Sequence, residues 1–247
     1  IHYYNTCFAI RNEDRFFMVD AGGGNGILQI LDKMNVQYSQ IHDLFVTHEH
    51  TDHLLGVVWM VRFIATRMLN GTYDGDLNIY CHDQLTSTID TFCRLTLQGK
   101  FYRLIGDRIH LIPVHDGETL SIMDYEVTFF DIHSTKARQF GFTTTLKNGK
   151  KLTCVGDEPY NPICAPYVEG SDWLLHEAFC LYGERERFKP YEKHHSTVMD
   201  SARLAEELHI GNLVLWHTED KSVGRRKELY LNVGKQYYHG NLFVPDN

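Results

Sequence analysis

The sequence predicts an α/β fold made of two mixed β-sheets with helices on both outer faces. Apolar runs of strand length recur along the 247 residues, and several are separated by segments with helical periodicity. Other runs follow one another across short turns such as Asn148-Gly149, a pair typical of antiparallel hairpins. Antiparallel runs mixed with helix-flanked strands indicate two sheets covered by helices.

The elements of the first half alternate clearly. A hairpin is expected around Asn12-Glu13-Asp14, because turn residues there separate two strand-like runs. Amphipathic or apolar segments of greater length predict the helices. The expected strands are residues 5–10, 16–20, 44–46, 77–80 and 108–112, and the expected helices are residues 27–34, 54–68 and 84–97.

The second half is predicted to be richer in strands. A run of short apolar segments leads up to the Asn-Gly turn, and later strands are separated by polar stretches. Ser196 or Thr197 is a suitable N-cap for the longest helix of this half. Strands are expected at residues 119–122, 125–132, 141–146, 151–155, 173–176 and 213–216, and helices at residues 196–208 and 222–235.

Composition limits the class of protein. Apolar content of 43% and charged content of 23% are those of a globular protein, and no linker-like stretch divides the chain, so we expect one domain over residues 1–247. No apolar stretch is long enough to span a bilayer, and no signal peptide opens the sequence. Six scattered cysteines favour unpaired thiols in a reducing cytoplasm. The net charge of −8 argues against binding long polyanions.

One short stretch is unusually dense in metal-ligand side chains. His48, His50, Asp52 and His53 directly follow an apolar strand-like run and precede a predicted helix. Side chains at alternate positions of such a turn can converge on one point while the next two point at a second. Imidazole nitrogen and carboxylate oxygen suit zinc, iron and manganese. We therefore predict a metal site here.

Three further ligand-type residues stand at the ends of predicted strands. His133 follows the 125–132 strand, Asp157 follows the 151–155 strand after a glycine, and His217 follows the 213–216 strand. Each alone is more often structural than catalytic. A site with two metal ions needs ligands from several strand ends, because one loop cannot surround both ions. The residues by themselves leave open both a structural role and a shared role in metal binding.

The pattern His48-x-His50-x-Asp52-His53 resembles the signature of the metallo-β-lactamase superfamily. The resemblance implies an αββα sandwich with a one- or two-metal site along one edge. It also implies that Asp20-Ala21-Gly22 is a structural corner beside that site, although a glycine-rich turn could instead cradle phosphate. Carried over by position, the first metal's ligands are His48, His50 and His133, the second's are Asp52, His53 and His217, and Asp157 bridges both.

All seven of these positions hold suitable ligands, so the resemblance implies a working dinuclear centre. Zinc is the first choice for both divalent ions, and manganese or iron would also suit the ligands. A bridging oxygen between two such ions is the arrangement that generates a hydroxide nucleophile near neutral pH.

Two later clusters narrow the resemblance. The run His176-Glu177-Ala178-Phe179 and the run His195-Ser196-Thr197 resemble the ribonuclease Z branch of phosphodiesterases. Lactonases, glyoxalases and β-lactamases instead carry another histidine shortly after the position of His133. No such histidine occurs in residues 134–142, where Phe140-Gly141-Phe142 resembles a ribonuclease Z motif.

His195 is the candidate to assist departure of the leaving group. An imidazole near a helix N-terminus can supply a proton or a positive charge to a leaving alkoxide. Glu177 is the candidate to hold the tautomer of His195. Asp52 and Asp157 are the candidates to orient the nucleophile or accept its proton. The alternative is that His194 and His195 are surface loop residues. The aromatic segment 179–191 is either a lid over the site or an ordinary surface loop.

We therefore expect a cytoplasmic metallohydrolase that cleaves a phosphodiester in a small molecule or nucleotide. The alternatives are a ribonuclease Z-type endonuclease for transfer RNA or other RNA, a carboxylic ester or lactone hydrolase on the same centre, and a metal-binding scaffold or sensor. The stretch between His133 and Asp157 has room for a hairpin only, not for the RNA-clamping arm of bacterial ribonuclease Z. The expected partner is a small anionic or phosphodiester substrate, with nucleic acid as the less favoured alternative and no membrane. The resemblance also allows a homodimer.

Overall fold

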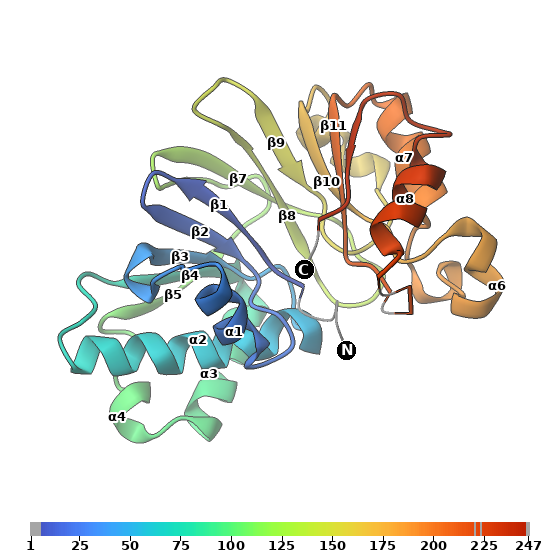
Figure 1. Cartoon of the computed structure of the whole chain (residues 1–247). Helices are drawn as coiled ribbons and strands as arrows, with labels where there is room; N and C mark the ends of the chain where they lie inside the picture. Colours follow the sequence, from blue (N-terminus) through green and yellow to red (C-terminus); the bar gives the residue numbers. More distant parts are fainter. Residues whose placement is uncertain (1–5, 220, 223, 246–247) are drawn as a thin grey trace. The chain divides into compact units, whose positions relative to one another are not determined.

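The computed structural model describes residues 6–219, 221–222 and 224–245, which fall into two compact units. The N-terminal unit consists of the described residues up to His115 together with Ile122–Asp124. The C-terminal unit consists of Asp116–Ser121 and the described residues from Tyr125 onward. Figure 1 traces both units in the colours of the sequence.

The described part of the N-terminal unit contains a five-stranded mixed sheet in the order β1-β2-β3-β4-β5. The first two strands form the expected antiparallel hairpin, and each later pair runs parallel. Parallel neighbours need crossovers, and the helices between them supply these. The strands are β1 Phe8–Asn12, β2 Arg15–Val19, β3 Ile41–Phe45, β4 Leu77–His82 and β5 Ile109–Val114.

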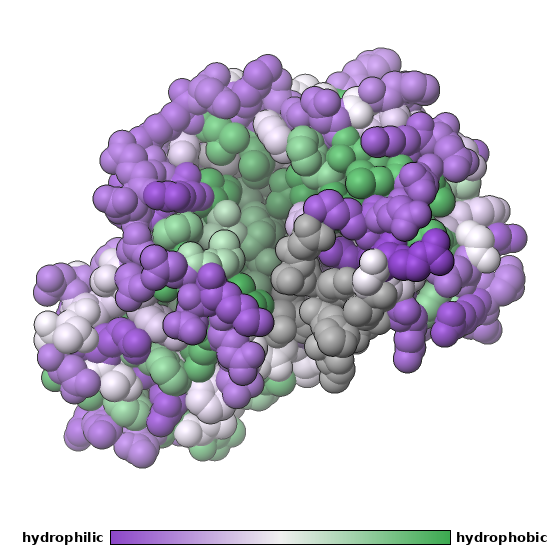
Figure 2. Space-filling model, viewed as in Figure 1, coloured by the Kyte–Doolittle hydropathy of each residue, from purple (hydrophilic) through white to green (hydrophobic). Residues whose placement is uncertain are grey.

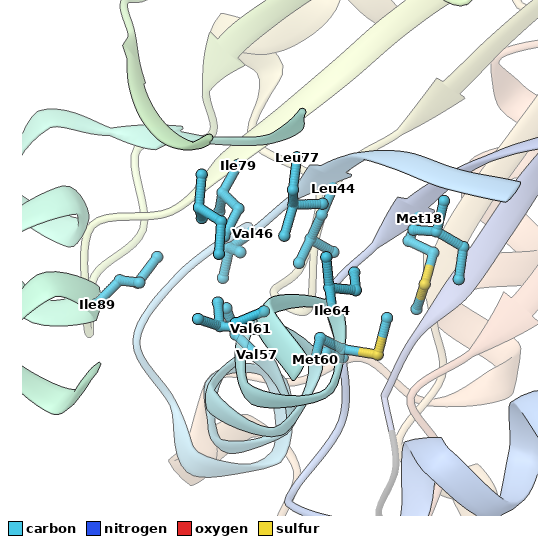
Figure 3. Close-up of a cluster of buried hydrophobic side chains, with 14 of the residues drawn as sticks. Met18, Leu44, Val46, Val57, Met60, Val61, Ile64, Leu77, Ile79 and Ile89 are labelled. Atoms are coloured by element: carbon cyan, nitrogen blue, oxygen red, sulfur yellow. The ribbon is translucent and has the colours of Figure 1, made fainter. Parts of the chain in front are cut away.

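The longer helices of this unit bury their apolar sides in a core shared with the sheet. The largest, α2 (Thr51–Leu69), buries Val57, Met60, Val61 and Ile64 against sheet residues such as Leu44 (Figure 3). Burial of side chains of this size contributes about 1.5–3 kcal/mol each. The other helices are α1 Gly26–Lys33, α3 Asp83–Thr96, α4 Gly99–Tyr102 and the short 3₁₀ helix η1 Tyr38–Gln40.

The second sheet has the order β12-β11-β10-β9-β8-β7-β6 among the described residues. Strands β7, β8 and β9 pair antiparallel, whereas β9, β10, β11 and β12 run parallel. The sheet is therefore mixed, as predicted. Its strands are β6 Thr119–Ile122, β7 Tyr125–Asp131, β8 Phe140–Thr145, β9 Lys151–Cys154, β10 Trp173–Glu177, β11 Asn212–Trp216 and β12 Asn241–Phe243.

Helix α7 (Val198–Glu207) anchors the core of the C-terminal unit. Val198, Ala202 and Ala205 pack with strand residues such as Leu174 and Leu213. Its N-terminus carries a capping box in which Thr197 accepts from the Asp200 amide and Asp200 accepts from the Thr197 amide. The remaining helices are α5 Ala165–Val168, α6 Arg185–Phe188, α8 Arg226–Gly234, η2 Pro162–Cys164, η3 Tyr182–Glu184 and η4 Tyr191–Lys193.

The predicted strands and longer helices are all present, with shifted ends. The last predicted helix begins at Arg226 rather than Ser222, because the residues before it form turns. Within the described residues, the structure adds short elements that the sequence did not indicate: α4, α5, α6, β12 and the 3₁₀ helices η1 to η4. Asn5 of the first predicted strand and Val223 of the last predicted helix lie outside the described residues.

The hydrophilic surface and the unpaired cysteine thiols are those expected of a globular protein. Hydrophilic side chains predominate over the α2–α4 region and over the α6–α8 region on the face shown in Figure 2. In the described part of the chain, no helix combines the length and the apolar character that crossing a bilayer requires. All six cysteines lie in this part, and no disulfide joins any of them, as expected.

Candidate functional site

The histidine cluster of the N-terminal unit follows the central strand β3. The strand ends at Phe45, the Val46 amide still bonds to Tyr80 of β4, and helix α2 begins at Thr51 with His50 as its N-cap. His48 and His50 therefore lie in the loop, whereas Asp52 and His53 belong to the first turn of the helix. The helix begins three residues earlier than the predicted start at residue 54, so it includes Asp52 and His53.

The structure brings these four residues together. The His48 ring lies 4.1 Å from that of His53 and 4.4 Å from that of His50, measured between ring centroids. The Oδ2 atom of Asp52 is 3.6 Å from Nε2 of His53 and accepts a hydrogen bond of 3.3 Å from the Thr6 hydroxyl. His48 and His53 are almost fully buried, so their clustering is not that of surface side chains.

Asp20, a carboxylate outside the predicted ligand set, organises the cluster. Its Oδ1 atom accepts from the Thr47 amide at 2.8 Å, and its Oδ2 atom accepts from the Thr47 hydroxyl at 2.9 Å. The same Oδ2 atom is 2.7 Å from Nδ1 of His53. An ionised carboxylate can only accept, so Nδ1 of His53 carries the proton and Nε2 keeps its lone pair.

The Thr47 hydroxyl extends this arrangement to His48. It lies 2.9 Å from Nδ1 of His48 and donates its own proton to Asp20. It therefore accepts from Nδ1–H of His48, which again leaves the lone pair on Nε2. Second-layer hydrogen bonds of this kind are what orient histidines for metal binding.

A close backbone approach holds Asp20 next to helix α2. The Ala21 amide donates to the His53 carbonyl, and the Gly56 amide donates to the Gly22 carbonyl. A Cβ atom added at Gly56 would lie 1.7 Å from the Ala21 carbonyl oxygen. Glycine is therefore required at position 56 for the turn after β2 to contact the helix. The turn acts as the structural corner that the Asp-x-Gly motif implied.

The C-terminal unit places the three predicted strand-end residues just beyond their strands. Asp157 follows β9 after Gly156, whose φ of +77° makes the sharp turn, and His217 directly follows β11. The structure brings these two together, with 3.4 Å between Nε2 of His217 and Oδ2 of Asp157. His133 follows β7, is exposed, and donates its amide to Oδ1 of Asp131 at 2.8 Å.

Left-handed backbone is common at these positions. Asp20, His133 and His217 have φ angles of +57°, +57° and +48°. Residues other than glycine adopt this region at a cost, and such residues cluster at functional sites.

His195 lies in the same unit and is buried, so it is not a surface loop residue. Its ring stacks on Phe179 at 4.8 Å and on His217 at 5.1 Å, between centroids. Its Nδ1 atom is 3.6 Å from Oε2 of Glu177. The neighbouring residue, His194, is exposed.

Glu177 is fully buried at the end of β10, and its other oxygen, Oε1, accepts from the Ser196 amide. The carboxylate thus holds the backbone directly after His195 as well as facing the imidazole. His176 points elsewhere, with Nδ1 2.7 Å from the Glu177 carbonyl and 3.1 Å from the Ser201 hydroxyl. Burial lowers the pKa of His176, so it stays neutral at pH 7, which fits a structural hydrogen-bonding role.

The chemistry of the donor set fits a metal ion of the zinc or manganese type. Imidazole nitrogens and carboxylate oxygens gather in both units, and the ligand atoms of Glu177, His195 and His217 lie within 4.8 Å of one another. Burial raises the pKa of the Cys7 and Cys180 thiols to about 12. Both thiols are therefore protonated at neutral pH when no metal is bound.

Sequence reasoning did not assign Asp20, Thr47 or Phe179 to the site. Asp20 had a signal, because its Asp-x-Gly motif marks a corner beside the histidines. Thr47 and Phe179 had none beyond their position next to assigned residues, since hydroxyl bridging and ring stacking depend on contacts that the sequence does not display.

Comparison with known proteins gives the following relatives. A family model described as "Anti-Pycsar protein Apyc1" matches residues 1–228. Ribonuclease Z of Phocaeicola vulgatus is 25% identical over 90% of this chain and 85% of its own length. Ribonuclease Z of a Synechococcus strain is 24% identical over 91% and 79%. The predicted resemblance to the ribonuclease Z branch is confirmed.

Solved structures establish the fold. The metallo-β-lactamase fold protein YhfI of Bacillus subtilis is 18% identical with a TM-score of 0.77, and the aligned region covers 98% of this chain and 89% of YhfI. The short form of human tRNase Z is 19% identical with a TM-score of 0.73, covering 98% and 90%. A diphosphatase of the PhnP family is 15% identical with a TM-score of 0.70, covering 97% and 80%. The predicted αββα sandwich is confirmed.

Proposed function

Because this chain belongs to the Apyc1 family of anti-Pycsar proteins and is a ribonuclease Z-like metallohydrolase, we propose that it hydrolyses a phosphodiester in a small molecule or nucleotide. The observation that carries the proposal is the buried His195, stacked on His217 and facing Glu177. In this proposal the imidazole is the proton donor, and it lies beside a predicted metal ligand. Cleavage of a phosphodiester needs such a donor, because the leaving alkoxide must be protonated or stabilised.

The proposed metal ligands are the seven residues that resemble those of the superfamily. They are His48, His50, Asp52, His53, His133, Asp157 and His217. Two divalent ions, zinc by first choice, would stabilise charge on the phosphoryl oxygens and lower the pKa of water. Asp20 and Thr47 support this assignment, since their hydrogen bonds place the protons of His53 and His48 on Nδ1, which is the tautomer that coordinates a metal through Nε2.

The chain's own side chains have separate tasks in this proposal. Asp52 orients the attacking water and accepts its proton. His195 directs Nδ1 toward Glu177, whose negative charge stabilises the imidazolium, and its Nε2–H donates to the departing oxygen. Glu177 also fixes the peptide of Ser196 and so holds His195 in place. Phe179 restricts rotation of the imidazole by stacking on it.

Several features favour a small phosphodiester over the alternatives. No second histidine follows His133 in residues 134–142, unlike the pattern of lactonases and β-lactamases. The β8–β9 hairpin occupies the stretch between His133 and Asp157, as expected, so no clamping arm is inserted there. With a net charge of −8, these features argue against RNA, although relatives of this chain are named ribonuclease Z.

The proposed compartment is the cytoplasm, because none of the six cysteines forms a disulfide. A non-catalytic metal-binding scaffold is less well supported, since a scaffold has no need of a buried proton donor next to its ligands.

The test compares three substrates on metal-loaded protein: a chromogenic phosphodiester, a chromogenic carboxylic ester and a lactone. Turnover of the phosphodiester alone is expected. Asp157→Ala should lose bound metal and activity together. His195→Ala should keep its metal but lose about 10²- to 10⁴-fold in kcat, the usual contribution of a general acid.

His239→Ala is the matched control, because His239 is an exposed histidine whose Nδ1 atom lies 2.9 Å from Oε1 of Glu206, away from the proposed ligands. It should behave as wild type in all three assays. Turnover of the ester or lactone instead would assign a different reaction to the centre. A fully active, metal-replete His195→Ala protein would contradict the role given to His195.

A further inference from the structure

Glu158 is a buried carboxylate that the proposed reaction does not use. It directly follows Asp157 and is only 5% exposed. Burying a carboxylate is costly unless hydrogen bonds and a positive charge compensate it. Its partners therefore show what the side chain stabilises.

All of the side-chain partners come from the segment that follows His133. Oε1 of Glu158 accepts from the Ser134 hydroxyl at 2.6 Å, and Oε2 accepts from the Thr135 amide at 3.2 Å. The Lys136 ammonium lies 3.8 Å from Oε1 and supplies the positive charge. One carboxylate thus binds three consecutive residues of a loop that is distant in sequence.

The backbone of His133 explains why this loop needs support. Its φ of +57° lies in the left-handed region, which a histidine occupies only when its surroundings hold it there. On the N-terminal side, Asp131 accepts the His133 amide at 2.8 Å. Glu158 provides the corresponding contacts on the C-terminal side. His133 is therefore fixed from both directions although its own side chain is exposed.

The same loop also reaches the segment that carries His195. The Thr135 hydroxyl lies 2.9 Å from Nδ1 of His194. Contacts that begin at Glu158 thus connect the loops of Asp157, His133 and His194 within the C-terminal unit.

We propose that Glu158 is a positioning residue that sets His133 relative to Asp157 for metal binding. The inference rests on the proposed function, which assigns both residues as ligands. Residues that orient ligands through hydrogen bonds typically change metal affinity by about 10- to 100-fold when removed. Glu158 would act in this way through the backbone of the His133 loop rather than through the imidazole itself.

The test measures metal binding directly. Metal-free wild type, Glu158→Ala and Glu158→Gln are titrated with Zn²⁺ in competition with a chromophoric chelator. The visible absorption of each protein loaded with Co²⁺ reports the geometry of the ligands. We expect Zn²⁺ affinity to fall about 10- to 100-fold in Glu158→Ala, with an altered Co²⁺ spectrum. Glu158→Gln should be intermediate, because its carboxamide keeps only one acceptor oxygen.

Two further variants keep the test decisive. Glu169→Ala removes an exposed glutamate of the same unit and should leave both readouts unchanged. Ser134→Ala removes one hydrogen bond to Glu158 and keeps the carboxylate with Thr135 and Lys136, so it is a milder change that tests the loop even where Glu158→Ala folds poorly. It should weaken Zn²⁺ binding less than Glu158→Ala does.

The outcomes separate the two proposals. Variants of Glu158 and Ser134 that bind Zn²⁺ as tightly as wild type, with an unchanged Co²⁺ spectrum, would overturn the positioning role even if their thermal stability falls. If wild type binds Zn²⁺ and cleaves the phosphodiester in that case, the proposed function stands alone. If wild type binds no metal, both proposals fail.

Discussion

Replacing Asp20 with asparagine is the sharpest perturbation of the histidine cluster, because it changes one atom and keeps the shape. The carboxamide oxygen can still accept from the Thr47 amide, as Oδ1 does at 2.8 Å. In the wild type, Oδ2 of Asp20 accepts from the Thr47 hydroxyl and from Nδ1 of His53. In the variant, the amide nitrogen of asparagine, which can only donate, takes the place of Oδ2. Two acceptor contacts become donor contacts. His53 must therefore move its proton to Nε2.

The expected magnitude follows from these contacts. A hydrogen bond to a charged group contributes about 1.5–3 kcal/mol, and the tautomer change lets one of the two contacts re-form. We expect the metal-free protein to lose about 1.5–3 kcal/mol of unfolding free energy. Metal affinity should fall about 10- to 100-fold, which corresponds to about 1.4–2.8 kcal/mol, because Nε2 of His53 now carries a proton.

Three measurements check this prediction: chelator competition for Zn²⁺, thermal unfolding of the metal-free protein, and ¹⁵N NMR of the histidine rings. Asp74→Asn is the control, since Asp74 is exposed in the same unit. The reasoning would be refuted by Asp20→Asn protein in which His53 keeps its proton on Nδ1 and the Zn²⁺ affinity is that of wild type.

Three other substitutions test the packing, the capping and the titration described above. Gly56→Ala places a Cβ 1.7 Å from the Ala21 carbonyl oxygen, so we expect a loss of at least about 1–3 kcal/mol in thermal denaturation, whereas Gly99→Ala, with open space around it, should be tolerated. Thr197→Ala removes the N-cap of α7 and should cost about 1 kcal/mol in urea unfolding. Burial lowers the pKa of His176 from 6.5, so the unfolded chain takes up the proton first and unfolding free energy should fall as pH drops below about 6.5. His176→Asn should weaken that pH dependence; an unchanged slope would contradict it.

The sequence was sufficient for the architecture because its signals are local. Apolar periodicity and the Asn148-Gly149 turn identify strands and helices without any tertiary information, and all of these were found. The short elements were missed because helices such as α4 and α5 have four residues each, too few to display a period. The three-residue strand β12 forms by pairing with β11, which no local pattern encodes.

The candidate site likewise has residues that the sequence displays and supporting contacts that only the folded chain shows. The His48–His53 cluster and the strand-end positions of His133, Asp157 and His217 are visible in the sequence because ligand residues follow apolar runs. The roles of supporting residues are not, since Glu177 binds the amide of Ser196 across a long sequence separation. Tautomers and ring stacking depend on such contacts, so they appear only once the chain is folded.

The left-handed conformations of His133 and His217 bear on how this protein could be engineered. Glycine would fit both backbone positions with less strain, so a screen for thermostability alone would favour substitutions at these two proposed ligands. Asp20 is different, because its carboxylate accepts hydrogen bonds that glycine would lose. Heat resistance and hydrolysis should therefore trade against each other at positions 133 and 217. Variants selected for both properties should retain both histidines and gain their stability elsewhere.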